Sequence, residues 1–322
     1  MYVVTGGAGF IGSNLVRGLN RRGITDILVV DDLERGEKHL GLNGLAFADY
    51  FDYRDFLTEL PKLEGARVDA ILHQGACSDT MEQDGRYMMR VNYEYSKALF
   101  QFAYGRCPFL YASSAATYGD GAAGFREEPA CEWPLNVYGY SKLAFDRWVR
   151  RNTLEVDGGP KSQVVGLRYF NVYGPQENHK GRMASVVFKF DGQIAEGGEL
   201  QIFEGSEDFL RDFVFVDDAV DVNLYFLDHP ERSGIFNCGT GRTESFAALA
   251  AEVAKHYPGS AITEVPFPDE LKGKYQAFTQ ADLTRLRDAG YTREFTSLAD
   301  GVAAYVRLLK ASGGFYRDAL ES

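Results

Sequence analysis

The sequence predicts an α/β protein with a doubly wound parallel sheet and a smaller α/β lobe. Short apolar segments typical of buried strands alternate with segments of helical spacing over the first half of the chain. Glycines stand where the first strand gives way to a helix, and the alternation breaks beyond Arg168. With 322 residues and 45% hydrophobic content, the chain is long enough for one large domain and a smaller lobe.

The first elements are a strand at 2–5, a helix that begins at Phe10 and a second buried strand at 26–30. The turn between the strand and the helix reads Gly6-x-x-Gly9-x-x-Gly12. Glycines at these positions permit a tight turn, a close approach of the backbone to a pyrophosphate and close packing of helix on strand. Backbone N–H groups and the positive end of the helix dipole then face the phosphates. The segment therefore predicts a dinucleotide site of the Rossmann type. Its expected contacts are Gly6, Gly9, Phe10, Ile11 and Gly12.

Two aspartates, Asp31 and Asp32, close the second strand about twenty residues after Gly12. A carboxylate there accepts hydrogen bonds from the ribose hydroxyls of NAD, whereas NADP needs cations for its 2′-phosphate. Arg35 and Lys38 follow immediately, either as such cations or as part of a solvated loop. The sequence therefore indicates a nicotinamide cofactor and leaves NADP and NAD as alternatives.

The alternation continues with strands at 45–48, 68–73 and 109–112 and helices at 54–60 and 85–103. Small residues follow the fourth strand and let a cofactor lie against the backbone. These expected contacts are Gln74, Gly75, Ala76, Cys77 and Ser78. Asn92 is expected to point its amide toward the cofactor or the fourth strand.

The fifth strand leads to Ser114, and Asn136 begins a helix that continues to about Arg151. Tyr138 and Lys142 are four residues apart and share a face of that helix. A phenol of pKa about 10 costs about 4 kcal/mol to ionise at neutral pH, and an ammonium about 4 Å away returns a similar amount. We therefore expect Lys142 to make Tyr138 a usable base, with Ser114 holding a substrate hydroxyl in line.

The same Tyr-x-x-x-Lys spacing recurs at Tyr93 and Lys97, so the spacing alone does not identify a site. This second pair is predicted in the middle of a helix, with no serine-bearing strand end a short way upstream. We therefore expect it to be structural.

Beyond Arg168 a loop at 176–183 is followed by a less regular run of elements. The expected elements are a helix at 184–196, a strand at 201–203, a return to the main sheet at 211–216, a strand from Gly234, a helix at 245–256, a strand at 262–265 and helices at 279–289 and 297–309. The expected domains are a cofactor-binding domain at 1–170, joined by 212–240, and a substrate-binding lobe at 171–211 and 241–322. The tail after Ser312 is expected to fray.

Composition narrows the classes of partner. A net charge of −12 disfavours nucleic acid and anionic membranes, because both would repel the surface. No apolar run approaches eighteen residues and no basic segment precedes the first strand, which indicates a cytoplasmic protein. The four cysteines are scattered, and neither they nor the histidines have the spacing of a metal site, so no metal is expected. His73, at a strand end, is expected to be a packed residue.

The glycine turn, Ser114 and the Tyr138-x-x-x-Lys142 pair together resemble the extended short-chain dehydrogenase/reductase family. The resemblance covers almost the whole chain. Within that family the chain is most similar to epimerases of ADP-linked heptoses. The segments behind this narrower match are 112–118, 169–175, 179–181, 203–206, 211–213 and 271–279. The family's dehydratases carry an Asp-Glu pair after the serine, and Ala115-Ala116-Thr117 lacks it, which argues against dehydration.

The resemblance implies inversion of C6″ of ADP-D-glycero-D-manno-heptose, a precursor of the lipopolysaccharide inner core, by transient oxidation and re-reduction with bound NADP. Such an inversion needs two proton-transfer groups, because the oxygen and hydrogen of the carbinol exchange places between the two poses. Tyr138 is one, and Lys180 is implied as the other. On its chemistry alone Lys180 is equally well a surface lysine. The resemblance also implies a homo-oligomer, with a pentamer as the implied assembly.

Further contacts are implied for both ligands. The further residues implied to contact the cofactor are Lys38, Asn92, Lys142, Val172 and Lys180. Those to the substrate are Ser114, Asn171, Arg182, Lys189, Phe203, Glu204, Gly205, Ser206, Arg211 and Tyr275. Arg211 is suited to bidentate pairing with a diphosphate, or else forms a salt bridge with Asp212 or Glu204. Arg182, Lys189 and Tyr53 depart from the family's pattern at their positions.

Two alternatives stay open at this point. One is another nucleotide-sugar epimerase, such as a UDP-hexose 4-epimerase. The other is a sensor or scaffold that binds a dinucleotide without chemistry, although such proteins tend to lose the tyrosine and lysine that this chain retains.

Overall fold

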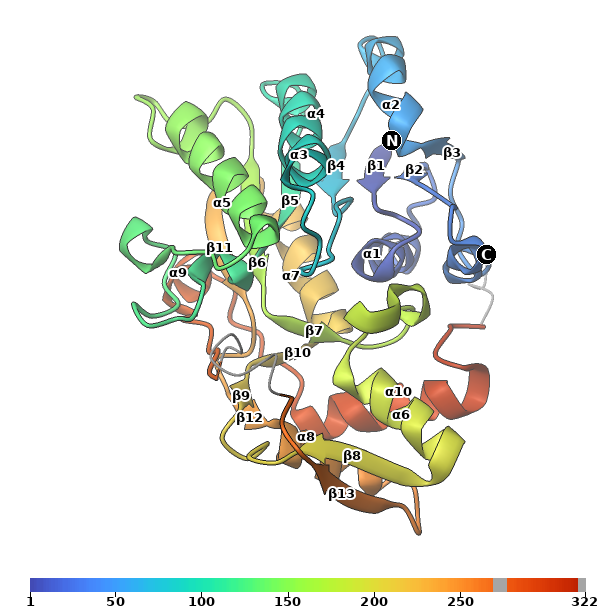
Figure 1. Ribbon diagram of the computed structural model, residues 1–322. Coiled ribbons are helices and arrows are strands. Elements are labelled where there is room, and N and C mark those ends of the chain that lie inside the picture. The colour runs from blue at the N-terminus through green and yellow to red at the C-terminus, as the bar shows by residue number, and fades with distance from the viewer. Residues whose placement is uncertain (269–276, 318–322) are drawn as a thin grey trace.

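The computed structural model describes residues 1–268 and 277–317. Its centre is a parallel sheet of seven strands in the order β11-β6-β5-β4-β1-β2-β3 (Figure 1). The strands are β1 (Tyr2–Thr5), β2 (Ile27–Asp31), β3 (Asp49–Asp52), β4 (Ala70–His73), β5 (Phe109–Ser114), β6 (Val164–Tyr169) and β11 (Gly234–Cys238). The direction of winding reverses between β1 and β4, and a crevice is expected at the carboxyl ends of strands at such a reversal. This sheet confirms the predicted fold class.

Helices cover both faces of the sheet. One face packs against α1 (Phe10–Asn20) and α7 (Val216–Asp228), through alternate strand residues such as Val4 and Val29. The other face packs, through Val3 and Phe109, against a second group of helices. These are α2 (Tyr53–Glu59), the π-helical turn η3 (Arg90–Glu94), α4 (Tyr95–Ala103), α5 (Val137–Val149) and the π-helical turn η6 (Arg150–Leu154), and α3 (Gly85–Met89) packs against η3 and α5. Short 3₁₀ turns are η1 (Gly36–Gly41), η2 (Leu60–Leu63), η4 (Ala115–Tyr118), η5 (Pro129–Cys131) and η7 (Asn178–Met183).

A second group of elements lies below the carboxyl end of the sheet in Figure 1, around a core of its own. Its strands pair as β7 (Asn171–Tyr173) with β10 (Phe213–Phe215), β8 (Glu199–Phe203) with β13 (Ala261–Val265), and β9 (Leu210–Arg211) with β12 (Glu244–Ser245). Its helices are α6 (Val186–Gly197), α8 (Phe246–Ala254) and α10 (Leu298–Ser312). By contrast, α9 (Thr284–Asp288) packs on β11, and Leu286 belongs to the core of the main sheet. The proposed division into two domains stays a prediction.

Two expected elements differ from the structure. The third strand lies at 49–52 instead of 45–48, because Leu45 and Phe47 pack against the core without joining the ladder. The helix expected from 279 begins only at Thr284, because the backbone at Thr279 hydrogen bonds to Leu210 of β9.

The expected fraying after Ser312 is wrong for Gly313 and Gly314. Gly314 O accepts a hydrogen bond of 2.9 Å from the backbone N–H of Gln176, and Gly313 O accepts one of 2.7 Å from the Asn178 side chain. The tail therefore docks against the loop that leads into η7.

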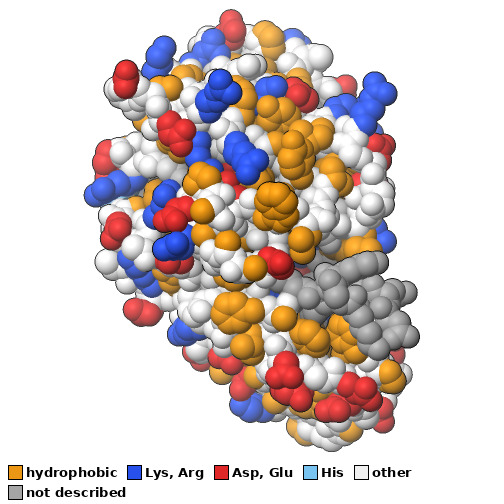
Figure 2. Space-filling view, turned by 60° about the vertical axis from the view of Figure 1, so that its left-hand side comes forward, with side chains coloured by type: hydrophobic (Ala, Val, Ile, Leu, Met, Phe, Trp, Pro, Cys, Tyr) orange, Lys and Arg blue, Asp and Glu red, His pale blue; other side chains and the backbone are white. Residues whose placement is uncertain are grey.

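Charged side chains of both signs are mixed on the surface shown in Figure 2. On the face shown in Figure 2, acidic and basic side chains of the described residues are interspersed around a central group of hydrophobic side chains. No helix among residues 1–268 and 277–317 is long and apolar enough to span a membrane. Within the same residues, no cluster of histidine, cysteine and carboxylate side chains is arranged to hold a metal ion.

Candidate active site

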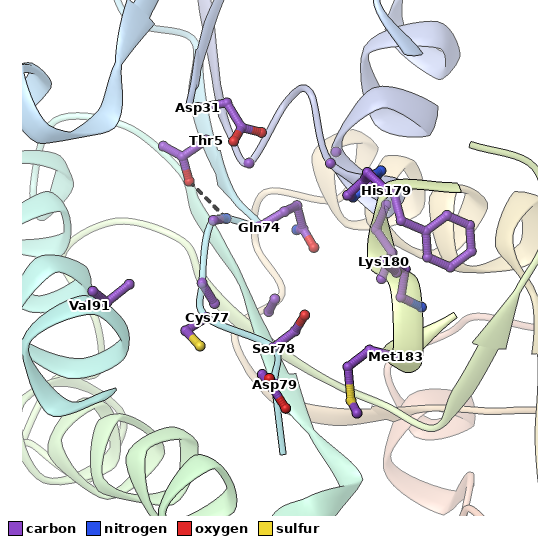
Figure 3. Close-up of a pocket in the computed structure, with 18 of the residues that line it drawn as sticks. Thr5, Asp31, Gln74, Cys77, Ser78, Asp79, Val91, His179, Lys180 and Met183 are labelled. Atoms are coloured by element: carbon purple, nitrogen blue, oxygen red, sulfur yellow. Dashed lines mark hydrogen bonds between the residues drawn. The ribbon is translucent and has the colours of Figure 1, made fainter. Parts of the chain in front are cut away.

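A cavity of about 850 Å³ lies at the carboxyl ends of β1, β2, β4 and β5, where the topology places a crevice. It is lined by residues from these strand ends, from α5 and from η7. The expected site residues that line it are Gly6, Gly9, Phe10, Ile11, Gly12, Asp31, Asp32, Lys38, Gln74, Gly75, Ala76, Cys77, Ser78, Ser114, Tyr138, Lys142, Val172, Lys180 and Arg182. In the view of Figure 3, His179, Lys180 and Met183 lie across the cavity from Cys77, Ser78 and Asp79.

The glycine turn has backbone contacts that leave no space for a side chain at Gly6 or Gly12. Gly6 has φ +68°, and a Cβ atom there would lie 2.6 Å from the backbone nitrogen of Gly75. A Cβ atom on Gly12 would lie 1.9 Å from the carbonyl oxygen of Gly6. Gly9 is the N-cap of α1, so the positive end of the helix faces the cavity. The glycines therefore permit close packing of the backbone, and the N-terminus of α1 provides dipole charge for a pyrophosphate.

The carboxylate of Asp31 connects this turn to the next loop. Its Oδ2 accepts a hydrogen bond of 2.8 Å from the backbone N–H of Ala8, and its Oδ1 pairs with Lys38. Burial raises the pKa of Asp31, and the charge of Lys38 opposes that rise. Lys38 also lies 3.3 Å from Asp32, and Arg35 donates to the carbonyl oxygen of His179 at 2.6 Å. Anionic and cationic groups therefore meet at the end of β2, which suits either NAD or NADP.

The tyrosine and lysine of α5 meet the end of β5. The helix begins after Asn136, whose Oδ1 accepts a hydrogen bond of 2.8 Å from the N–H of Gly139. Lys142 Nζ donates to the carbonyl oxygen of Ala112 at 2.8 Å, and burial lowers the pKa of Lys142 to about 8. Burial raises the pKa of Tyr138, and a hydrogen bond with Ser114 opposes that rise. Tyr138, Lys142 and Ser114 therefore line one cavity, but the expected lowering of the Tyr138 pKa by Lys142 is not found.

Asn92 lies behind the cavity wall and holds it in place. Its side chain donates to Cys77 O at 2.9 Å and accepts from Cys77 N at 2.8 Å, which fixes the loop after β4. The second Tyr-x-x-x-Lys pair lies away from the cavity lining, with Lys97 Nζ 4.5 Å from the centre of the Tyr93 ring.

The opposite wall carries Lys180. Its Nζ lies 3.3 Å from Glu177 Oε2 and 4.7 Å from the centre of the Phe10 ring. Burial, together with the nearby charges of Lys38 and Lys180, lowers the pKa of His179 to about 4, so this imidazole is neutral. Arg182 forms an ion pair with Asp79, which joins η7 to the loop after β4.

The other expected substrate residues do not line this cavity. They lie at the start of β7 (Asn171), on α6 (Lys189), at the end of β8 (Phe203), in the turn after it (Glu204, Gly205 and Ser206) and in β9 (Arg211). Burial lowers the pKa of Lys189, and the charge of Glu177 opposes this. Asp212, an expected alternative partner of Arg211, accepts hydrogen bonds from Thr240, Gly241 and Ala281. Tyr275 lies outside the described residues.

Sequence reasoning missed several residues of the cavity wall. Tyr87, Val91 and Tyr95 line it from α3, η3 and α4, and their spacing of four is a signal that was available. Asp79 also lines the cavity, but its partner Arg182 is 103 residues away and no local pattern connects the two. His73 is packed as expected, 2.6 Å from Thr5 Oγ1 and 2.8 Å from Ser96 Oγ.

Comparison with known proteins gives consistent matches. The model of the NAD dependent epimerase/dehydratase family matches residues 2–239. An ADP-L-glycero-D-manno-heptose-6-epimerase of Brachyspira hyodysenteriae is 54% identical over 320 residues, which cover 98% of this chain and 99% of the relative.

Two solved structures of enzymes are also similar. The crystal structure of Helicobacter pylori ADP-L-glycero-D-manno-heptose-6-epimerase has 29% identity, a TM-score of 0.82 and 96% coverage of both chains. A Thermus thermophilus UDP-glucose 4-epimerase complex with NAD has 27% identity and a TM-score of 0.78, and the match covers 97% of this chain and 99% of that chain.

Proposed function

Because this chain belongs to the NAD dependent epimerase/dehydratase family, we propose that it inverts C6″ of ADP-D-glycero-D-manno-heptose. The product is ADP-L-glycero-D-manno-heptose, a nucleotide sugar for the lipopolysaccharide inner core. The 54% identity over nearly all of both chains supports this substrate. Structurally, the proposal depends on one observation: Tyr138 and Lys180, from two different elements, line a single cavity beside the glycine turn.

A nicotinamide bound beside the glycine turn would supply the reversible hydride transfer that oxidises the carbinol carbon and reduces it again from the opposite face. In one pose of the sugar, Tyr138 Oη exchanges a proton with the C6″ oxygen. In the other pose the oxygen has moved across, and Lys180 Nζ exchanges the proton. Ser114, hydrogen bonded to Tyr138, holds the sugar hydroxyl in line. Lys142, which lines the same cavity, is the proposed contact of the cofactor beside Tyr138.

For the cofactor we propose NADP, with NAD as the alternative. Lys38 and Arg35 supply positive charge at the end of β2 for a 2′-phosphate, while Asp31 and Asp32 suit ribose hydroxyls. The mass of the nucleotide released when the purified protein is denatured decides between the two.

The substrate contacts proposed are Ser114, Asn171, Arg182, Lys189, Phe203, Glu204, Gly205, Ser206, Arg211 and Tyr275. We further propose that the cofactor binds to 1–170 with 212–240, and the sugar to 171–211 and 241–322. A homo-oligomer, pentameric by the resemblance, and a cytoplasmic location complete the proposal.

The test is an epimerisation assay with two substrates. Purified protein is incubated with ADP-D-glycero-D-manno-heptose or with UDP-galactose, and the sugar products are separated by anion-exchange chromatography. We expect conversion of the ADP-heptose without net formation of reduced cofactor. Steady accumulation of NADPH or NADH would contradict epimerisation, and faster conversion of UDP-galactose would favour a UDP-hexose 4-epimerase.

A further inference from the structure

We propose that Glu177 is a positioning residue that holds Lys180 in place inside the cavity. This inference rests on the proposed function, in which Lys180 is the second acid/base. The Glu177 carboxylate is fully buried, and its Oε2 lies 3.3 Å from Lys180 Nζ. A buried carboxylate is tolerated in a folded protein only when it is paired and hydrogen bonded. Its partners therefore reveal what it is placed to hold.

The carboxylate is fixed from the side of α6. Its Oε2 accepts a hydrogen bond of 2.7 Å from the backbone N–H of Ser185, and its Oε1 accepts one from the Ser185 hydroxyl. Ser185 is the N-cap of α6, because its hydroxyl also accepts from the N–H of Phe188. Glu177 is thus attached to the beginning of a helix that packs into the core of the lower group of elements.

The backbone on both sides of Glu177 is held by the C-terminal tail. Gln176 has φ +77°, the only positive φ of a non-glycine residue among 1–268 and 277–317. This conformation is unfavourable for a glutamine side chain and persists only where the surroundings impose it. Here the N–H of Gln176 donates to Gly314 and the side chain of Asn178 donates to Gly313. The strained backbone and the docked tail therefore place Glu177 in one position.

The lysine has a second restraint on the cavity side. Lys180 Nζ lies over the ring of Phe10 in α1, which together with Glu177 limits the directions that the ammonium can take. Glu177 is also a counter-charge for Lys189 on α6. Removal of the carboxylate charge would leave the repulsion between Lys180 and Lys189 without a counter-charge and would free Lys180 to leave the cavity. A displacement of about 1 Å of a reacting group can cost up to about a hundredfold in rate.

The experiment combines Glu177→Gln with Lys180→Met. Glu177→Gln keeps an acceptor for Ser185 but removes the charge, so we expect kcat to fall about 10- to 100-fold with KM for ADP-heptose little changed. Lys180→Met alone should cost about 10²- to 10⁴-fold in kcat. The double variant should be no slower than Lys180→Met, because Glu177 acts through Lys180. Glu177→Asp, which keeps the charge, should retain more activity than Glu177→Gln.

A readout independent of turnover follows the lysine itself. Limited acetylation with acetic anhydride, quantified at Lys180 by peptide mass spectrometry, should be several-fold faster in Glu177→Gln than in the parent protein. Glu127→Gln is the matched control, because Glu127 is also buried and accepts a backbone hydrogen bond, from Asn237 at 2.6 Å. It should change neither kcat nor the labelling of Lys180.

The outcomes separate the two claims. If Lys180→Met is inactive while Glu177→Gln keeps full kcat and unchanged labelling, the positioning role is wrong and the proposed function stands. If Glu177→Gln slows the Lys180→Met background as much as the parent, Glu177 is merely structural, which also overturns the inference. If Lys180→Met keeps full activity, the role of Lys180 in the proposed function fails, and the inference fails with it.

Discussion

The ammonium of Lys142 donates to the carbonyl oxygen of Ala112 at 2.8 Å, which ties α5 to the end of β5. The lysine is 6% exposed, and the low polarity around it disfavours its charged form. The carboxylate of Asp146, four residues further along α5, favours the charged form of Lys142 and so opposes the lowering of its pKa by burial. The same carboxylate accepts hydrogen bonds from Tyr111 and Ser113 of β5. One buried aspartate therefore positions the strand end and supports the lysine.

This arrangement predicts a loss of activity in alkaline solution. Burial lowers the pKa of Lys142 to about 8, so the side chain is charged below that pH and loses its proton as the pH rises through it. Since the charged ammonium of Lys142 lines the cavity as a proposed contact of the cofactor, we expect kcat to decline above about pH 8. The guanidinium of Lys142→Arg stays charged over this range. We therefore expect the residual kcat of this variant not to decline above about pH 8. A flat rate between about pH 7 and 9.5 in the parent protein would contradict the prediction.

Tyr138→Phe should abolish most of the turnover without loss of the cofactor. The change removes only the hydroxyl that exchanges the proton, and loss of a general acid/base costs about 10²- to 10⁴-fold. Tyr140→Phe is a matched control on the same helix, because Tyr140 is 51% exposed. Turnover is measured by product chromatography, and cofactor retention by the nucleotide released on denaturation. Normal turnover by Tyr138→Phe would show that Tyr138 is not the acid/base of the reaction.

Gly12→Ala should remove cofactor binding. The new methyl group would overlap the carbonyl oxygen of Gly6, from which a Cβ atom would be only 1.9 Å away. Gly192→Ala is the control, because Gly192 lies in α6 and a Cβ atom there would have no atom within 4 Å apart from its chain neighbours and the backbone of its own helix. Alanine in a helix also gains about 0.5–1 kcal/mol over glycine. We expect nucleotide to be retained by the control and lost from Gly12→Ala. Equal nucleotide content in the two variants would show that the turn is not a pyrophosphate site.

His73 should make the protein less stable in mild acid. Burial lowers the pKa of His73 to about 3, whereas an unfolded histidine titrates near 6.5. Between these values the unfolded chain binds a proton that the folded chain does not, so the free energy of unfolding falls as pH drops from about 6.5 toward 3. Urea unfolding of His73→Gln should show a shallower decline than the parent, because all other groups titrate in both proteins. Equal slopes would refute this role for His73.

The parts of the fold that depend on a local sequence pattern could be predicted from the sequence. The glycine turn, the strand ends at Asp31 and Ser114 and the pair on α5 each depend on a few neighbouring residues, and they meet in one cavity because parallel strands end at the same edge. The shift of the third strand to 49–52 was not predictable, since the apolar residues Leu45 and Phe47 mark burial and not backbone pairing.

Contacts between distant loops could not be predicted either. The pairing of Asp79 with Arg182 and the docking of Gly314 on Gln176 each join segments over 100 residues apart, through single polar groups without periodicity. Glu177 likewise gives no signal in the sequence, because a lone glutamate before a glycine-bearing loop is typically exposed. Only the folded chain shows that this carboxylate is buried.

The most destabilising single substitution that we predict is Arg168→Met, beneath the candidate site. Arg168 is fully buried in β6, where its guanidinium donates to Asp146 at 2.9 Å and pairs with Glu132. Removal of one partner from a buried ion pair leaves an uncompensated charge and costs about 3–5 kcal/mol. The exposed pair of Arg22 with Asp228, at 2.8 Å, is the control, and Arg22→Met should cost about 0–1 kcal/mol. Because Asp146 also holds Ser113 beside Ser114, Arg168→Met should lower kcat as well, whereas Arg22→Met should not. Urea unfolding and product chromatography measure both effects, and equal stabilities of the two variants would contradict this account.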